Sequence, residues 1–146
     1  MRLFLASTKS LSISTPRLTG AGCYTHKETI QSGTKAAAHG GFTTIMAMPN
    51  VIPYPDNVDT MTAYLAKIKQ DALVHVLPYA CITKGEASKE VVDMKGLSAM
   101  GIHAFSDDGV GVATAEMMKQ AMQACSQRVP LPYLFVFLLL HEGHDR

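Results

Sequence analysis

The residues with the most chemistry to offer are two adjacent aspartates, Asp107 and Asp108, at the start of a loop that also contains Gly109 and Gly111. Paired carboxylates can bind a cation through their oxygens, or they can act as general acid and base. The commoner role of an Asp-Asp-Gly sequence is a plain turn, in which an Asp side chain accepts hydrogen bonds from nearby backbone. The residue pattern by itself leaves both interpretations open.

Several other side chains could also have either a functional or a purely structural role. Asn50 follows Pro49, a position typical of a turn residue. Cys81 has no obvious base beside it, which favours a small buried hydrophobic residue over a reactive thiol. His141 and His144 have the three-residue spacing of a metal-binding pair, but their place near the C-terminus, around Gly143, favours a frayed tail.

Predicted helices and strands alternate through the middle of the chain and would position these residues. A capping box of Thr25 and Glu28 predicts the start of the first helix, and Asn57 or Asp56 predicts the start of the second, with Val58, Met61, Leu65 and Ile68 as its apolar stripe. Thr114 predicts the start of the last helix, with Met117, Met118, Ala121 and Cys125 on its apolar face. The predicted helices are 25–39, 56 or 57 onward, 86–99 and 114 onward, and the predicted strands are 42–48, 73–80 and 102–106.

This alternation predicts an α/β fold with a parallel sheet and right-handed crossovers. In such folds ligands bind at the carboxyl ends of the strands. Asn50, Cys81 and the Asp107–Asp108 pair each follow a predicted strand. We therefore expect them at one edge of the sheet.

Composition restricts the function classes. The chain has 146 residues, enough for one domain, and its 13 Lys and Arg against 12 Asp and Glu give a formal net charge of +1. A surface that binds nucleic acid or an anionic membrane through bulk charge is therefore not expected. Three widely spaced cysteines without a CxxC pair argue against a disulfide scaffold or a zinc knuckle. The apolar run 131–140 is half the length of a membrane-spanning helix, so a membrane span is not expected there. With no export signal predicted, these features favour the cytoplasm.

Several ordered motifs resemble the bacterial dihydroorotases of the amidohydrolase superfamily. They are Thr25-His26-Lys27-Glu28-Thr29, Gly40-Gly41-Phe42-Thr43-Thr44, Met48-Pro49-Asn50 and Phe105-Ser106-Asp107-Asp108-Gly109-Val110-Gly111. The resemblance covers residues 24–127. It implies a (β/α)₈ TIM barrel of the metal-dependent hydrolase type. Because a whole barrel takes about 250 residues, we expect this one to be partial and incomplete at both ends.

The resemblance also implies an activity, the reversible cyclisation of N-carbamoyl-L-aspartate to dihydroorotate in pyrimidine biosynthesis. Zinc, two ions per complete enzyme, would activate water and stabilise charge on oxygen. The motif maps a metal ligand onto Asp108, with Asp107 as the weaker choice, and a substrate-carboxylate contact onto Asn50. Related hydantoinases use a carboxylated Lys near this strand, and the Ser106-Asp107 sequence here favours a dihydroorotase. A small-molecule substrate is implied, and a homodimer is an assembly that the resemblance allows.

The two ends depart from the family pattern. Residues 1–23 lack the expected His-x-His pair and the substrate-binding Arg, and residues 128–146 lack the expected histidine ligand. One hypothesis is that residues 1–23 are translated out of frame, because a one-base shift of codons for Leu18 to Gly22 can encode Leu-Arg-Glu-Pro-Gly. Of the expected metal ligands only Asp108 remains, so we expect this chain alone to be inactive. The alternatives are an inactive truncated fragment and a noncatalytic dihydroorotase-like subunit.

Overall fold

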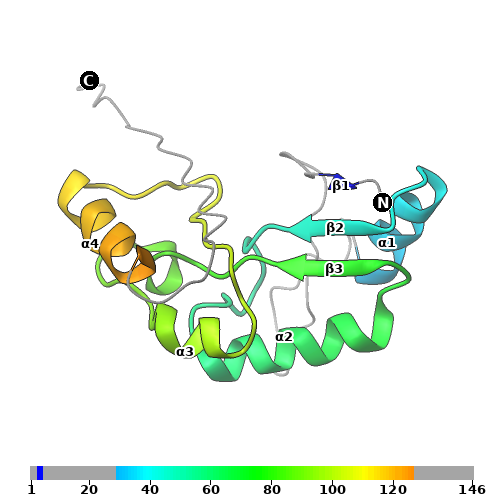
Figure 1. Ribbon diagram of the computed structural model, residues 1–146, viewed down its shortest axis with the longest axis horizontal. Coiled ribbons are helices and arrows are strands. Elements are labelled where there is room, and N and C mark those ends of the chain that lie inside the picture. The colour runs from blue at the N-terminus through cyan, green and yellow to red at the C-terminus, as the bar shows by residue number, and fades with distance from the viewer. Residues whose placement is uncertain (1–2, 5–28, 127–146) are drawn as a thin grey trace.

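A parallel sheet organises the part of the chain that the computed structural model describes, residues 3–4 and 29–126 (Figure 1). Its strand order is β1-β2-β3, and both pairings are parallel. The strands are β1 (Leu3–Phe4), β2 (Thr44–Ala47) and β3 (His75–Pro78). The helices are α1 (Ile30–His39), α2 (Val58–Asp71), the short 3₁₀ turn η2 (Lys84–Glu86), α3 (Met94–Ala99) and α4 (Ala115–Ser126). The predicted alternation of helices with parallel strands is confirmed for these residues.

Strand β2 lies between β1 and β3, and its burial fits that position. Thr44, Ile45 and Ala47 are buried, as expected for a strand covered on both faces. On β3, burial alternates, with Val76 and Pro78 buried. In Figure 1 the arrowheads of β2 and β3 point the same way, toward the loops that lead to α3 and α4. Both strands are shorter than predicted, but they lie within the predicted ranges.

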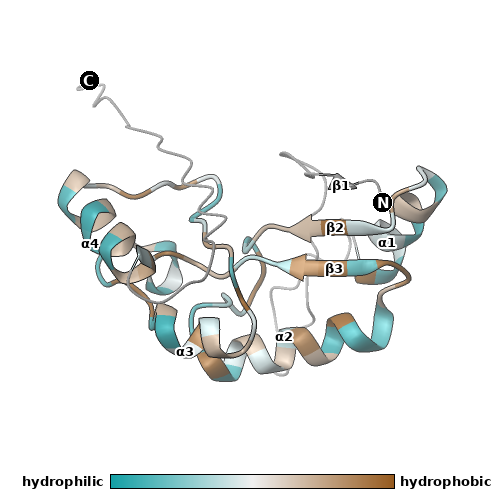
Figure 2. Ribbon diagram, viewed as in Figure 1, coloured by the Kyte–Doolittle hydropathy of each residue, from teal (hydrophilic) through white to brown (hydrophobic). Residues whose placement is uncertain are grey.

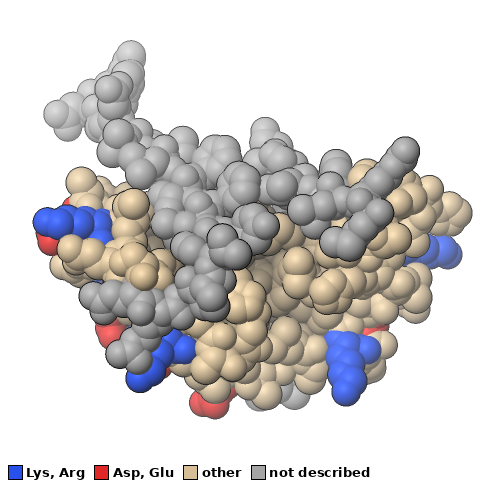
Figure 3. Space-filling model, in the orientation of Figure 1, with Lys and Arg blue, Asp and Glu red and all other residues tan. Residues whose placement is uncertain are grey.

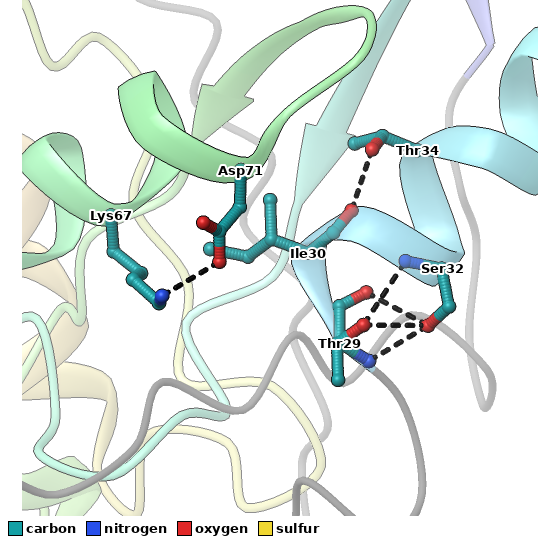
Figure 4. A network of polar contacts seen from close by, with 6 residues as sticks. All are labelled: Thr29, Ile30, Ser32, Thr34, Lys67 and Asp71. Atoms are coloured by element: carbon teal, nitrogen blue, oxygen red, sulfur yellow. Dashed lines mark hydrogen bonds and ion pairs between the residues drawn. The ribbon is translucent and has the colours of Figure 1, made fainter.

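Helix α1 begins later than the sequence predicts. Thr29 is extended, with φ −118° and ψ 160°, and it caps a helix that begins at Ile30. The Oγ1 of Thr29 accepts from the Ser32 backbone N–H at 3.0 Å, and the Oγ of Ser32 accepts from the Thr29 N–H at 3.0 Å (Figure 4). A predicted helix start at Thr25 is therefore wrong, because this reciprocal capping box lies one turn further on. Thr25 and Glu28 themselves lie outside the described residues.

Helix α2 begins where the sequence predicts. The Oδ1 of Asn57 accepts from the Thr60 N–H at 3.0 Å and caps the helix. Its buried face consists of Met61, Tyr64 and Ile68, so the predicted stripe is partly wrong: Val58 is 43% exposed, and Tyr64 was missed. Figure 2 shows hydrophobic and hydrophilic bands alternating along this helix. An ion pair between Lys67 and Asp71, at 2.8 Å, spans one turn of α2 (Figure 4).

Replacing Asn57 with alanine is expected to lower the free energy of unfolding by about 1 kcal/mol, because the Thr60 N–H loses its acceptor. Asn57→Ser retains a capping oxygen and should stay within about 0.5 kcal/mol of the unsubstituted chain. Urea unfolding followed by circular dichroism measures both. Equal losses in the two variants would mean that the cap does not stabilise α2.

The predicted helix 86–99 is wrong over most of its length. Residues 84–86 form η2, and α3 is confined to Met94–Ala99. Glu86 and Ser88 both have a φ of 53°, in the left-handed region, and Thr83 forms a bridge with Val91. The Gly85 N–H donates to Asp56 Oδ2 at 2.9 Å, so a contact with a distant loop fixes the backbone here. Tertiary hydrogen bonds have overridden the helical spacing of the apolar residues.

The last predicted strand is mostly absent from the described residues, whereas the last predicted helix is confirmed. The predicted strand 102–106 is reduced to a single parallel bridge between Ala80 and Phe105. Helix α4 follows Thr114 as predicted, with the Met117 N–H donating to Thr114 Oγ1 at 3.2 Å. The buried residues of α4 are Met118, Ala121 and Cys125, all members of the predicted apolar face.

Predictions for residues 5–28 and 127–146 lie outside the described residues. These include the out-of-frame hypothesis, the apolar run 131–140 and the pair His141 and His144. Within the described part, no helix is long and apolar enough to cross a membrane. On the face seen in Figure 3, the charged side chains that are drawn in colour form small scattered spots, and some blue and red spots adjoin.

Candidate functional site

Backbone hydrogen bonds hold three segments side by side where the strands end. The Tyr79 N–H donates to the carbonyl of Ala47 at 2.8 Å, just beyond the ends of β3 and β2. The Ala80 N–H donates to the carbonyl of Ala104, and the Ser106 N–H donates back to the carbonyl of Ala80, both at 2.9 Å. The segments that follow β2, β3 and Phe105 therefore lie at one edge, which confirms the predicted arrangement.

Asn50 and Asp108 meet at this edge although 58 positions separate them. The Nδ2 of Asn50 donates to Asp108 Oδ2 at 3.0 Å, and both residues are half-buried. The Oδ1 of Asn50 is buried and has no hydrogen-bond partner among the described residues. Burial raises the pKa of Asp108 above its ordinary value. The structure thus brings the two predicted site residues together and leaves a polar atom of Asn50 available.

Asp107 has a different environment from its neighbour. Its side chain is 5% exposed, and its Oδ1 accepts from the backbone N–H groups of Ile82 at 2.7 Å and Thr83 at 3.1 Å. Its Oδ2 accepts from the Thr83 hydroxyl at 2.5 Å. These three hydrogen bonds join the segment after β3 to the segment after Phe105. Asp107 therefore braces the loop, while Asp108 contacts Asn50.

The Asp-Asp-Gly sequence also forms a turn. The carbonyl of Asp107 accepts from the Gly111 N–H at 2.9 Å and the Val110 N–H at 3.3 Å. Gly109 has a φ of 83° and Gly111 a φ of 73°, conformations that favour glycine. The two interpretations left open by the sequence are therefore compatible: the backbone makes a turn, and the turn presents Asp108 toward Asn50.

Thr83 and Ser88 connect this turn to the loop around η2. The Ser88 N–H donates to Thr83 Oγ1 at 3.0 Å, and the Ser88 hydroxyl donates to the carbonyl of Gly111 at 3.3 Å. The Ala113 N–H donates to Ser88 Oγ at 3.0 Å. Sequence reasoning missed both residues, because an isolated Thr or Ser in a predicted loop or helix carries no signal for a long-range contact.

Three buried side chains near these hydrogen bonds of Asp107 could act as metal ligands. Cys81, Glu86 and Asp107 are all buried and each offers one ligand atom, and these atoms lie within 4.8 Å of one another. Burial, together with the nearby carboxylates of Asp107 and Asp108, raises the pKa of Glu86 to about 8. Burial also raises the pKa of Cys81, as do the neighbouring acids, so its thiol is protonated and unreactive in this state. The predicted burial of Cys81 is confirmed, whereas Glu86 was missed because it was assigned to a helix.

The zinc implied by the family resemblance can be compared with this geometry. A catalytic zinc takes three protein ligands. Among the described residues, the group of three that could hold a metal consists of Cys81, Glu86 and Asp107, and it does not include Asp108. Asp108 contacts an amide rather than a second ligand. The described residues around Asp108 alone therefore do not make a fitting catalytic zinc site.

A cavity of about 520 Å³ lies elsewhere, along α4. Its walls are mostly apolar, and its lining includes Val112, Met118 and Met122. None of the candidate site residues lines it. The candidate site at the strand exits is thus separate from this cavity.

Comparison with known proteins gives a consistent picture. Residues 9–129 match the family model described as dihydro-orotase-like. A protein named dihydroorotase from Macrococcus caseolyticus is 56% identical over 102 residues, which cover 70% of this chain and 24% of the relative. Dihydroorotases from Staphylococcus epidermidis and Listeria monocytogenes are each 54% identical, over 107 and 98 residues, covering 73% and 67% of this chain and 25% and 23% of the relatives. The chain thus spans about a quarter of the length of the curated relatives that it matches.

Proposed function

The chain belongs to the dihydroorotase-like family, and from this we propose that its described residues supply part of a dihydroorotase active site. The reaction is the reversible cyclisation of N-carbamoyl-L-aspartate to dihydroorotate by a zinc amidohydrolase. The observation that carries the proposal is the 3.0 Å contact between Asn50 and Asp108 at the strand exits. Ligand sites of parallel α/β folds lie at this position.

We also propose that the fold is part of a (β/α)₈ barrel of the metal-dependent hydrolase type. Support comes from the parallel order β1-β2-β3, because neighbouring parallel strands joined by helices are the repeating unit of such a barrel. Helix α2 connects β2 to β3 in this way. The bridge between Ala80 and Phe105 extends the same parallel pairing by one further segment.

Asp108 would provide one metal ligand, and Asn50 would bind the substrate. The Asn50 amide donates one N–H to Asp108, which leaves its second N–H for a substrate carboxylate and its buried Oδ1 for a substrate N–H. In the complete enzyme two zinc ions would supply Lewis acidity and activate water. Their other ligands are not among the described residues.

Further proposals on partners, location and assembly follow from composition and family. A formal net charge of +1 argues against nucleic acid or an anionic membrane surface as a partner, and the family membership supports a small-molecule substrate. The family membership also supports a cytoplasmic location and a homodimeric assembly. Gel filtration of the purified chain would test the assembly.

The second candidate function is a noncatalytic dihydroorotase-like polypeptide. The observation that favours it is that Asp108 has no companion ligand among the described residues. The chain alone is then expected to show no turnover of dihydroorotate. This expectation concerns the isolated chain and does not bear on the capacity of residues 29–126 to serve within a whole enzyme.

A chimera separates the two candidates. Residues 29–126 would replace the matching segment of the dihydroorotase from Macrococcus caseolyticus, with which the chain is 56% identical over 102 residues. If these residues supply a working part of the site, dihydroorotate hydrolysis should stay within about tenfold of the parent, a loss of at most about 1.4 kcal/mol in transition-state stabilisation. A folded, zinc-loaded chimera without turnover would favour the noncatalytic role.

A further inference from the structure

We propose that Cys81, Glu86 and Asp107 form a site for a divalent cation of the zinc class, separate from the role proposed for Asp108. The proposal rests on geometry, burial and an unpartnered buried oxygen in the described residues, and it does not depend on the dihydroorotase activity. It assigns a function to Cys81 and Glu86, which the proposed enzyme site does not use.

The three side chains are arranged closely enough to share an ion. Their ligand atoms lie within 4.8 Å of one another, and the residues are 0%, 6% and 5% exposed, respectively. In a tetrahedral zinc site, metal–ligand distances of about 2.0–2.3 Å place neighbouring ligand atoms about 3.3–3.8 Å apart. A modest change in side-chain torsions would close the group around an ion.

A carboxylate oxygen in this group has no partner. The Oε1 of Glu86 is buried, and the described part of the chain gives it no hydrogen-bond donor. The ion pairs among the described residues join Lys67 to Asp71 and Lys84 to Glu90, so neither neutralises Glu86 or Asp107. A buried polar oxygen without a partner is costly, and a bound cation would pair with it.

Asp107 has an acceptor position left for a metal ion, although it already accepts three hydrogen bonds. A carboxylate offers about four acceptor positions, and three are taken by Ile82 N–H, Thr83 N–H and the Thr83 hydroxyl. Two of these donors bind Oδ1 and one binds Oδ2, so an acceptor position of Oδ2 stays open. Carboxylate ligands of metals are themselves held by such hydrogen bonds, which fix their orientation.

The donor set selects the class of ion. A thiolate is a soft ligand that favours zinc and similar transition metals over Mg²⁺ and Ca²⁺, which prefer oxygen alone. Binding would release the Cys81 proton, and any proton on Glu86, to solvent, because both side chains coordinate in their deprotonated forms. Three protein ligands leave one tetrahedral position for water. The ion would tie the segment after β3 to the loop that carries Asp108.

Titration of the metal-free, reduced 146-residue chain with Co²⁺ tests the proposal, because thiolate coordination to Co²⁺ adds a charge-transfer absorption band that oxygen ligands do not give. The band should appear with the unsubstituted chain, decline when Zn²⁺ is added and persist when Mg²⁺ is added. Cys81→Ser should abolish it, and Glu86→Gln should weaken Co²⁺ binding at least about tenfold. Matched controls are Cys125→Ser, which removes another buried cysteine, and Cys23→Ser; both should retain the band.

Two results would overturn the proposal. One is the absence of the band at saturating Co²⁺ in a chain whose three thiols are reduced. The other is a band that survives Cys81→Ser or disappears in Cys125→Ser or Cys23→Ser. Circular dichroism checks that each variant folds, and Cys81→Ala replaces Cys81→Ser if the hydroxyl is not tolerated. Asp108→Asn should retain the band, so failure here and failure of the proposed enzyme function give different results.

Discussion

Replacing Asp107 with alanine is expected to lower the free energy of unfolding by about 3–5 kcal/mol in the presence of a chelator. The substitution removes a buried carboxylate and leaves the N–H groups of Ile82 and Thr83 without their acceptor. Each buried donor left unpaired costs about 1–3 kcal/mol, and hydrogen bonds to charged groups are the stronger ones. Losing the brace should also loosen the loop that carries Asp108.

Graded variants distinguish this brace from a general effect of removing charge. Asp107→Asn keeps an oxygen for the two backbone N–H groups, so its loss should be smaller, about 1–2 kcal/mol. Asp108→Ala removes the neighbouring carboxylate, whose described contact is a single hydrogen bond from Asn50, and should cost about 1 kcal/mol or less. Urea unfolding measures all three variants. Equal losses for Asp107→Ala and Asp108→Ala would refute the assigned difference between the two aspartates.

The position of the site was predictable because it depends on a rule of topology. Parallel strands end at a common edge, and Asn50 and Asp108 each follow a predicted strand or its remnant. Their place at one edge, in spite of the 58 positions between them in sequence, follows from the parallel arrangement, and the structure adds a direct contact of 3.0 Å. The roles of the two residues in catalysis are a separate matter: they come from the family resemblance and are still predictions.

The different contacts of Asp107 and Asp108 could not be predicted from the sequence. Adjacent side chains leave the backbone in different directions, so one can bind Thr83 while the other contacts Asn50. The sequence Asp-Asp-Gly does not indicate which aspartate binds Thr83 and which contacts Asn50. The backbone N–H donors that bind Asp107 belong to a loop 24 to 25 positions earlier, and only the folded chain brings them together.

The segment around Glu86 shows why local spacing failed. Val91, Met94 and Leu97 have helical spacing, and this predicted a helix over 86–99. The observed backbone instead follows hydrogen bonds from distant residues, including the Gly85 N–H to Asp56 and the Ser88 hydroxyl to Gly111. Helix propensity is worth a few tenths of a kcal/mol per residue, which such contacts readily exceed. A buried Glu86 beside Cys81 and Asp107 was therefore invisible before the fold was known.

Asp108→Asn in the chimera is expected to lower kcat for dihydroorotate hydrolysis about 10³-fold with little loss of stability. A ligand that holds a metal supports several kcal/mol of transition-state stabilisation, and each 1.36 kcal/mol corresponds to a factor of ten. The fold should tolerate the substitution. Burial raises the pKa of Asp108 and so disfavours its charged form, which makes an uncharged amide of the same shape acceptable at that position.

Asn50→Ala in the same chimera provides the contrast. If Asn50 binds the substrate carboxylate, the loss of a hydrogen bond to a charged group costs about 1.5–3 kcal/mol, which should raise KM roughly 10–100-fold and change kcat less. Steady-state kinetics with zinc content measured for each variant separates the two roles. Asp108→Asn should lose zinc and kcat, whereas Asn50→Ala should keep zinc. If both variants keep zinc and show the same rise in KM, Asp108 is a substrate contact and the metal ligand lies elsewhere.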